Sequence, residues 1–249
     1  MNRPLKRILY VEDEPDIRTI AVTVLESLGG FSVIACSSGR EAIEAAPSAA
    51  PDLLLLDVMM PGMDGPTTLA ALRALPQTAQ TPAVFMTAKV QASEIAQFKS
   101  LGAFEVIPKP FDPMTLASQL TDIWARCAGS AQPAAKAPAP ADSLRDGLAK
   151  LYGEYAADLP SIIANIESLG TIFASTGEVE TLKALHQALH TLAGTAGTFG
   201  YTELGKAARS LELSIAPHLP DAKVPASIIA SFAGVFETMR RAAVAPDKS

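Results

Sequence analysis

Short apolar runs alternate with longer segments of helical periodicity over the first half of the chain. The apolar runs predict strands at 8–12, 31–36, 52–57, 83–87 and 105–108. The leucines at 53–56 are consecutive, which is typical of a strand buried on both faces. Helices are predicted between the strands, at 15–28, 39–46, 65–75, 93–101 and 113–127. Five such repeats indicate an α/β fold with a doubly wound, five-stranded parallel sheet.

The second half shows helical periodicity without strand alternation. Helices are predicted at 143–157, 160–174, 178–199, 202–216 and 225–243. Short connections between long helices favour an all-α antiparallel bundle. Residues 129–141, rich in proline and alanine, are typical of a semi-extended linker. The predicted organisation is a first domain at 1–128, a linker at 129–141 and a bundle at 142–249.

Composition excludes several classes of protein. The 249 residues include 20 Lys plus Arg and 26 Asp plus Glu, a net charge of −6, so nucleic-acid binding is not expected. No run of 18 apolar residues is present, and membrane insertion is not expected either. The two cysteines, Cys36 and Cys127, make neither a disulfide framework nor a zinc site. We therefore expect a cytoplasmic protein.

Polar side chains mark the ends of four predicted strands. Glu12 and Asp13 end the first strand, Asp57 the third, Thr87 the fourth and Lys109 the fifth. In a doubly wound sheet these ends meet at one edge, where ligands bind. Converging carboxylates repel one another unless a cation joins them, and Mg²⁺ prefers such oxygen ligands. A carboxylate nucleophile, a metal, a hydroxyl and an ammonium group together equip a site for phosphoryl transfer.

Four segments of the first half occur in the order ILYVEDEPDIR, LLLLDVMMPGMDG, FMTAK and PKPF. On these segments and their spacing, residues 5–127 resemble a two-component response-regulator receiver domain. The resemblance implies a flavodoxin-like fold, a cis Lys109–Pro110 peptide and Asp57 as the phosphoacceptor. It also implies that Thr87 contacts the phosphoryl group, that Lys109 pairs with it, and that Mg²⁺ is held by Glu12, Asp13, Asp57 and the backbone carbonyl of Met59. The chain has Val106 where such receivers often carry an aromatic switch residue.

A histidine in the second half lies beside small residues. Around His190, a helical face brings together His186, Gln187, Ala193, Gly194 and Gly197. Glycine inside a helix costs about 1 kcal/mol relative to alanine, so the two glycines need a reason. One reason is close helix packing, and the other is access of a docking partner to the imidazole. A metal site at His186 and His190 is disfavoured because no third ligand is evident, and His218 is expected in a loop.

This pattern resembles a histidine phosphotransfer (HPt) domain over residues 143–243. His190, Gly194, Gly200 and the pair Leu211–Glu212 carry the resemblance. It implies a four-helix bundle in which His190 exchanges phosphoryl groups with receiver aspartates across an access face at Gln187, Gly194 and Gly197. Such domains usually have a lysine at the position of Ala193. Lys206 or Arg209, on the following helix, are candidates to replace its charge.

The leading interpretation is therefore a phosphorelay signalling protein, not an enzyme acting on small substrates. Its expected partners are a sensor histidine kinase, other receivers and HPt proteins, and its expected cofactor is Mg²⁺. An alternative is a receiver-controlled docking protein whose bundle no longer carries phosphate, because of Ala193. A phosphohydrolase that uses Asp57 is disfavoured, since the second aspartate of such enzymes is replaced by Met59. A kinase is excluded because no glycine-rich ATP site follows His190.

Overall fold

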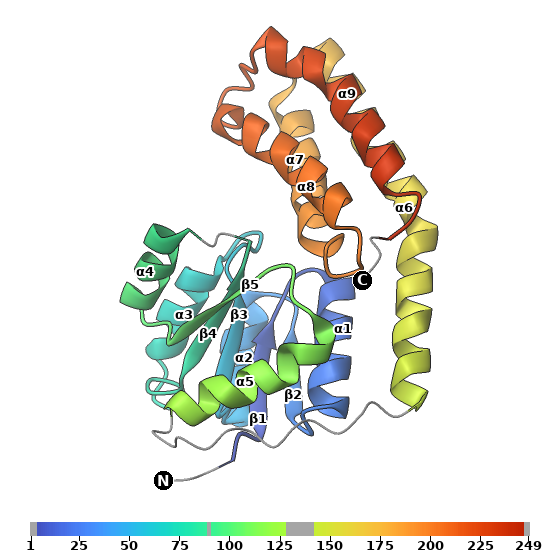
Figure 1. The fold of residues 1–249 in the computed structure, drawn as a ribbon. Coiled ribbons are helices and arrows are strands. Elements are labelled where there is room, and N and C mark those ends of the chain that lie inside the picture. Colours follow the sequence, from blue (N-terminus) through green and yellow to red (C-terminus); the bar gives the residue numbers. More distant parts are fainter. Residues whose placement is uncertain (1–3, 89–90, 128–141, 247–249) are drawn as a thin grey trace. The chain divides into compact units, whose positions relative to one another are not determined.

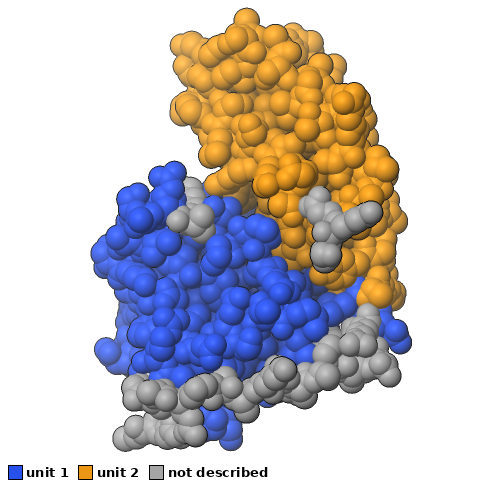
Figure 2. Space-filling model, in the orientation of Figure 1, with its two compact units in different colours: residues 1–148 blue, residues 149–249 orange. Residues whose placement is uncertain are grey.

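The computed structural model describes residues 4–88, 91–127 and 142–246. It divides into two compact units, residues 1–148 and 149–249, which are coloured separately in Figure 2. The linker predicted at 129–141 lies outside the described residues. The exact domain limits of 1–128 and 142–249 stay a prediction. In the part of the chain that the structure describes, no helix is long and apolar enough to cross a membrane.

The first unit is built on a parallel sheet with the strand order β2-β1-β3-β4-β5 (Figure 1). This confirms the predicted five-stranded, doubly wound fold, in which β1 and β3 are neighbours. Leu53 to Leu56 are fully buried, as their consecutive run predicts. Pro108, which has no N–H for a further ladder, lies on the edge strand. The strands are β1 (Arg7–Val11), β2 (Ser32–Cys36), β3 (Leu53–Asp57), β4 (Ala83–Thr87) and β5 (Glu105–Pro108).

Five helices cover this sheet. Helices α1 and α5 contact each other, as do α2 and α3. Alternate strand residues such as Leu9, Leu54 and Phe85 share one core with α2, α3 and α4. Pro15 and Pro113 begin their helices, as predicted, because a first-turn residue needs no N–H partner. The helices are α1 (Pro15–Ser27), α2 (Gly39–Ala49), α3 (Gly65–Arg73), α4 (Ala92–Ser100) and α5 (Pro113–Cys127).

The second unit differs from the prediction at its first helix. Instead of two helices that break at 158–159, α6 is one helix, Asp142–Thr176, with Pro160 inside it. A proline removes one hydrogen bond to the carbonyl four residues earlier, here that of Ala156. Both Pro160 and Ala156 lie on the exposed side, where water can satisfy this carbonyl. The buried stripe of Tyr155, Leu159 and Ile163 runs past the proline, and its packing holds the helix together.

The remaining helices complete an antiparallel bundle, α7 (Val179–Thr195), α8 (Thr202–Ile215) and α9 (Ala226–Ala242). Helix α8 contacts both α7 and α9. The prediction of one helix over 178–199 is wrong at its end, because α7 stops at Thr195 and residues 196–200 form turns. Gly197 therefore lies after the helix rather than within it, and Gly200 ends the turns with a φ of +83°, which favours glycine. His218, expected in a loop, ends a short 3₁₀ helix, η1 (Ala216–His218).

Candidate functional site

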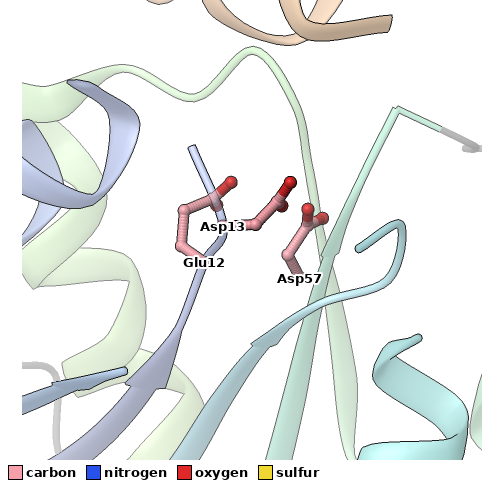
Figure 3. A group of neighbouring side chains, drawn as sticks. All are labelled: Glu12, Asp13 and Asp57. Carbon is pink, nitrogen blue, oxygen red and sulfur yellow. The ribbon is translucent and has the colours of Figure 1, made fainter. Parts of the chain in front are cut away.

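Three carboxylates converge at the carboxyl edge of the sheet. Glu12 and Asp13 follow β1, and Asp57 ends β3, the neighbouring strand. One oxygen of each lies within 4.8 Å of the others, and Figure 3 shows the side chains turned toward one another. Within residues 4–88, 91–127 and 146–246 this is the one group of three or more such side chains able to hold a metal ion. The strand-end pattern thus brings these side chains together in space.

Lys109, which directly follows β5, joins the carboxylates. Its ammonium donates to both oxygens of Glu12, at 2.9 and 2.7 Å, and lies 3.1 Å from Asp57 Oδ1. The lysine side chain is only 8% exposed, so these ion pairs are poorly screened by water. The peptide between Lys109 and Pro110 is cis, as the receiver resemblance implies. Thr87, at the end of β4, is buried, and its carbonyl accepts the Lys109 N–H at 2.8 Å.

Two further residues, not identified from the sequence, hold the acidic segment. The Tyr10 hydroxyl donates to Glu12 Oε2 at 3.1 Å, and Tyr10 is fully buried. Strand alternation puts residues 10 and 12 on one face, a signal that was available in the sequence. From α1, Arg18 donates to the carbonyls of Glu12 and Asp13, at 2.6 and 3.1 Å. No periodicity in the sequence indicates that contact.

The loop after Asp57 is tightly folded against the strand. A Cβ at Gly65 would lie 2.2 Å from the Asp57 carbonyl oxygen, so glycine is required by this close approach. The Gly65 N–H donates to the Val58 carbonyl at 2.9 Å, and Asp64 caps α3 by accepting from Thr67. Met59, two residues after Asp57, packs its side chain against the core. The close approach of Gly65 and the capped start of α3 together hold the loop that follows Asp57 against the strand.

Burial dominates the electrostatics of the acidic site. It raises the pKa of Glu12 to about 7, although Lys109 opposes the shift, and Asp57 adds to it. Burial, with Glu14 and Asp57, raises the pKa of Asp13 to about 6. Burial alone would lower the pKa of Lys109, but attraction to Asp57 and Glu12 outweighs it and raises the pKa. One ammonium therefore does not neutralise three carboxylates.

The acidic site fits a hard divalent cation. Oxygen Oδ1 of Asp13 is buried and has no hydrogen-bond partner. A buried acceptor without a donor is costly, and a cation would satisfy it. Three carboxylates within reach of one another are the ligand type that Mg²⁺ prefers.

In the bundle, His190 is bound to a carboxylate on the next helix. Its Nδ1 lies 2.9 Å from Oε1 of Glu212, whose side chain is 3% exposed. Arg209, also on α8, donates to the other oxygen of Glu212 at 2.7 Å. Burial by itself would raise the pKa of Glu212, but His190 and Arg209 outweigh it and hold the pKa below its usual range. His190 and Arg209 are thus linked through the carboxylate of Glu212.

His186 lies beside His190 and Glu212. Its ring is parallel to that of His190, with centroids 6.5 Å apart, and its Nε2 lies 3.8 Å from Glu212 Oε1. Burial lowers the pKa of His186, with Glu212 opposing the shift. No metal-ligating group that includes these histidines occurs among the residues whose side chains are described.

The face around His190 is open rather than tightly packed. A Cβ at Gly194 would meet nothing within 4 Å, so close packing does not explain this glycine. Gln187 is exposed and Gly197 is half-buried. Close packing instead occurs at Gly170 on α6, where a Cβ would lie 2.5 Å from the ring of Phe236. The small residue at 194 leaves room beside the imidazole, as the access explanation requires.

Both units match known families. The model of the response regulator receiver domain family matches residues 8–121, and that of the Hpt domain family matches residues 150–242. This chain joins a receiver domain to an Hpt domain. Both domains are of the kinds that occur in two-component phosphorelay signalling. Receiver domains bind Mg²⁺ at an acidic pocket, and Glu12, Asp13 and Asp57 form an acidic cluster in this one.

The relatives resemble part of the chain. Transcriptional regulatory protein CpxR of Escherichia coli (strain K12) is 37% identical over 128 residues, which are 51% of this chain and 53% of CpxR. Alkaline phosphatase synthesis transcriptional regulatory protein PhoP of Bacillus subtilis (strain 168) is 36% identical over 121 residues, 49% of each chain. This chain spans about half the length of these curated relatives. The solved structure of chemotaxis protein CheY4 of Vibrio cholerae is 31% identical, with a TM-score of 0.45, over 48% of this chain and 98% of CheY4.

Proposed function

We propose that Asp57 accepts a phosphoryl group in the presence of Mg²⁺ and that His190 exchanges phosphoryl groups with a receiver aspartate. The observation that carries the first half is the cluster of Glu12, Asp13 and Asp57 within 4.8 Å, joined by Lys109. The second half rests on the 2.9 Å contact of His190 with Glu212 beside an open Gly194. Each unit thus offers one nucleophile held by charged neighbours.

At the receiver site, an Asp57 oxygen attacks the phosphorus of a phosphohistidine or acetyl phosphate. A P–O bond to the aspartate forms, and the bond to the leaving nitrogen or acetate oxygen breaks, with the electron pair going to the leaving group. Lys109 and the Thr87 hydroxyl are proposed to contact the transferred oxygens, where positioning and charge neutralisation supply most of the catalysis. Glu12, Asp13, Asp57 and the Met59 carbonyl would hold Mg²⁺, which supplies further positive charge to the phosphoryl oxygens.

At the bundle site, the carboxylate of Glu212 holds a proton on Nδ1 of His190. The neutral ring then carries its lone pair on Nε2, which is the nucleophile. Nε2 attacks the phosphorus of a receiver's aspartyl phosphate, the P–N bond forms, and the aspartate leaves with the electrons of the broken P–O bond. The ionised Glu212 stabilises the positive charge that the ring gains in this step.

The test is phosphorylation of the full chain by acetyl phosphate with Mg²⁺, followed by intact mass. Wild type, Asp57→Ala and His190→Gln are compared, and each adduct is tested for lability in acid and alkali. We expect an alkali-labile adduct that Asp57→Ala lacks and His190→Gln retains. An acid-labile, alkali-stable adduct that both His190→Gln and Asp57→Ala lack would place both sites in one relay.

An unmodified Asp57 in the presence of both acetyl phosphate and a cognate kinase would contradict the receiver half of the proposal. The docking alternative predicts instead that a His190→Gln protein still signals. That outcome would remove His190 from the relay and leave the receiver assignment intact.

A further inference from the structure

The helix that carries His190 provides no cation next to it. The residues one turn before His190 are His186 and Gln187, and those one turn after it are Ala193 and Gly194. The nearest lysine on α7, Lys183, lies two turns away and pairs with Glu180 at 2.7 Å. The neighbour that His190 does have on α8, Glu212, is an anion. A phosphoryl group on the ring would therefore face a carboxylate across the imidazole, with like charges opposed.

Helix α8 supplies the missing positive charge at Arg209. Its guanidinium is 2.7 Å from Oε2 of Glu212, while Oε1 of the same carboxylate holds His190. The Arg209 side chain is 21% exposed, so its charge acts in a partly dry site. Lys206, one turn earlier on α8, is 67% exposed and pairs with Glu203 at 2.8 Å. Lys206 and Arg209 are thus close in sequence but pair with different carboxylates, Glu203 and Glu212.

We propose that Arg209 is the positioning residue of the His190 site, which balances the charge of Glu212 so that a phosphoryl group can be bound on the ring. This inference rests on the proposed phosphotransfer role of His190. Without Arg209, Glu212 still holds the Nδ1 proton, but its charge opposes the incoming phosphoryl group. With Arg209, the carboxylate orients the ring at little electrostatic cost. A cation placed elsewhere on the same site, at position 193, serves the same purpose.

The experiment uses the full chain carrying Asp57→Ala, so that phosphate on Asp57 cannot contribute. Phosphoramidate is the donor: the His190 Nε2 attacks its phosphorus, the P–N bond of the donor breaks, and ammonia leaves. The rate of the acid-labile adduct is measured by intact mass and phosphorus NMR. In this background we compare Arg209→Gln, Lys206→Gln as the matched control, Ala193→Lys, and the pair Arg209→Gln with Ala193→Lys. His190→Gln identifies the modified ring.

Arg209→Gln is expected to slow adduct formation roughly 10- to 100-fold, less than the loss of a donor in direct contact with the reacting atoms, because Arg209 acts through Glu212 and is partly exposed. Lys206→Gln is expected to change it less than about twofold, because exposed charges contribute little. Ala193→Lys is expected to restore most of the rate lost in Arg209→Gln. A purely structural role of Arg209 could not be rescued from another helix. Nitrogen NMR shifts are expected to retain the Nδ1–H form of His190 in Arg209→Gln.

Three results would overturn the inference. They are an unchanged rate in Arg209→Gln, an equal loss in Lys206→Gln, or a loss that Ala193→Lys does not restore. If the parent protein forms no adduct on His190 at all, the proposed phosphotransfer function fails, and the inference falls with it. If the parent reacts and Arg209→Gln reacts equally, only the inference fails. Circular dichroism of each variant checks that the helices are intact.

Discussion

The two sites use buried carboxylates with opposite electrostatics. In the receiver, burial raises the pKa of Glu12 to about 7 and that of Asp13 to about 6, because one lysine faces three acids. In the Hpt domain, burial also acts to raise the pKa of Glu212, but contacts with His190 and Arg209 lower it. The same side-chain chemistry therefore gives a protonation-prone cluster in one unit and a firmly ionised carboxylate in the other.

This difference indicates where the positive charge that balances each group of carboxylates comes from. The receiver site has an excess of negative charge and a buried Asp13 oxygen without a hydrogen-bond partner, features that fit a bound cation. The Hpt site has a counter-charge for Glu212 within its own unit, at Arg209. In our proposals, charge neutralisation is supplied by a diffusible ion in the receiver and by Arg209 in the bundle.

The largest expected effects on stability come from removal of Lys109 or Arg209, the cations beside these carboxylates. Lys109→Met leaves buried carboxylates uncompensated and is expected to destabilise the receiver by about 3 kcal/mol without metal at pH 8. Arg209→Met is expected to destabilise the bundle by about 1 kcal/mol, since Glu212 keeps His190 and the arginine is partly exposed. Equal losses in the two units would contradict the difference in their electrostatics.

These losses are measured by urea unfolding of the full chain in EDTA. Trp124 on α5 is the single tryptophan, so its fluorescence reports the receiver alone. Circular dichroism reports the helices of both units, so the bundle transition is the part of that signal which the Trp124 transition does not account for. Lys99→Met is the matched control in the receiver, because Lys99 is 45% exposed and pairs with Glu105 at the surface. It is expected to cost less than about 1 kcal/mol.

Binding of Mg²⁺ should depend on pH in one unit only. Because the pKa values of Glu12 and Asp13 are raised in the metal-free fold, protons compete with the ion at pH 6 but hardly at pH 8. We expect roughly tenfold tighter binding at pH 8, measured as the shift of the Trp124 unfolding midpoint with Mg²⁺ concentration. The same shifts mean that the metal-free receiver loses stability as pH rises through about 4.5 to 7.

Asp13→Asn tests the assignment of this pH dependence. It is expected to weaken Mg²⁺ binding at both pH values and to flatten the difference between them. His186→Gln, a titratable group removed from the bundle, is the control and should change neither quantity. A Mg²⁺ affinity that does not vary between pH 6 and pH 8 would argue against direct competition at the acidic cluster.

Much of the fold follows from local sequence pattern, and its failures have identifiable causes. The strands and the order that makes β1 and β3 neighbours are predicted because apolar runs and β–α alternation leave few topologies. The continuity of α6 through Pro160 is not predicted, since a proline signals a break locally. Tertiary burial of Tyr155, Leu159 and Ile163 on one face overrides that signal.

Some site residues can likewise be predicted from the sequence, whereas others are found only from tertiary contacts. Strand-end residues such as Asp13 and Asp57 are found from the sequence because topology alone brings them together. Arg18 and Arg209 act through contacts that depend on side-chain reach across elements, which spacing does not encode. Two cations on α8 were equally good candidates in sequence, and only their partners, Glu203 and Glu212, distinguish them.

The smallest expected effect concerns Gly194, where stability and function should change in opposite directions. Alanine there meets no neighbour within 4 Å and removes the conformational cost of a helical glycine. We expect Gly194→Ala to stabilise the bundle by about 0.5–1 kcal/mol, in contrast with Gly65 of the receiver, where a Cβ would collide with the Asp57 carbonyl. If the glycine serves access to His190, the same variant should slow phosphoryl transfer from a receiver severalfold.

Gly234→Ala, on α9, is the matched control for this prediction. A Cβ at Gly234 also meets nothing within 4 Å, and the residue is exposed within its helix. It should give the same gain in stability, measured by thermal unfolding, without any change in the transfer rate. A transfer rate that falls equally in both variants would indicate that bundle rigidity, rather than space beside the imidazole, limits transfer. A rate that falls in neither would mean that a receiver docks without using the opening at Gly194.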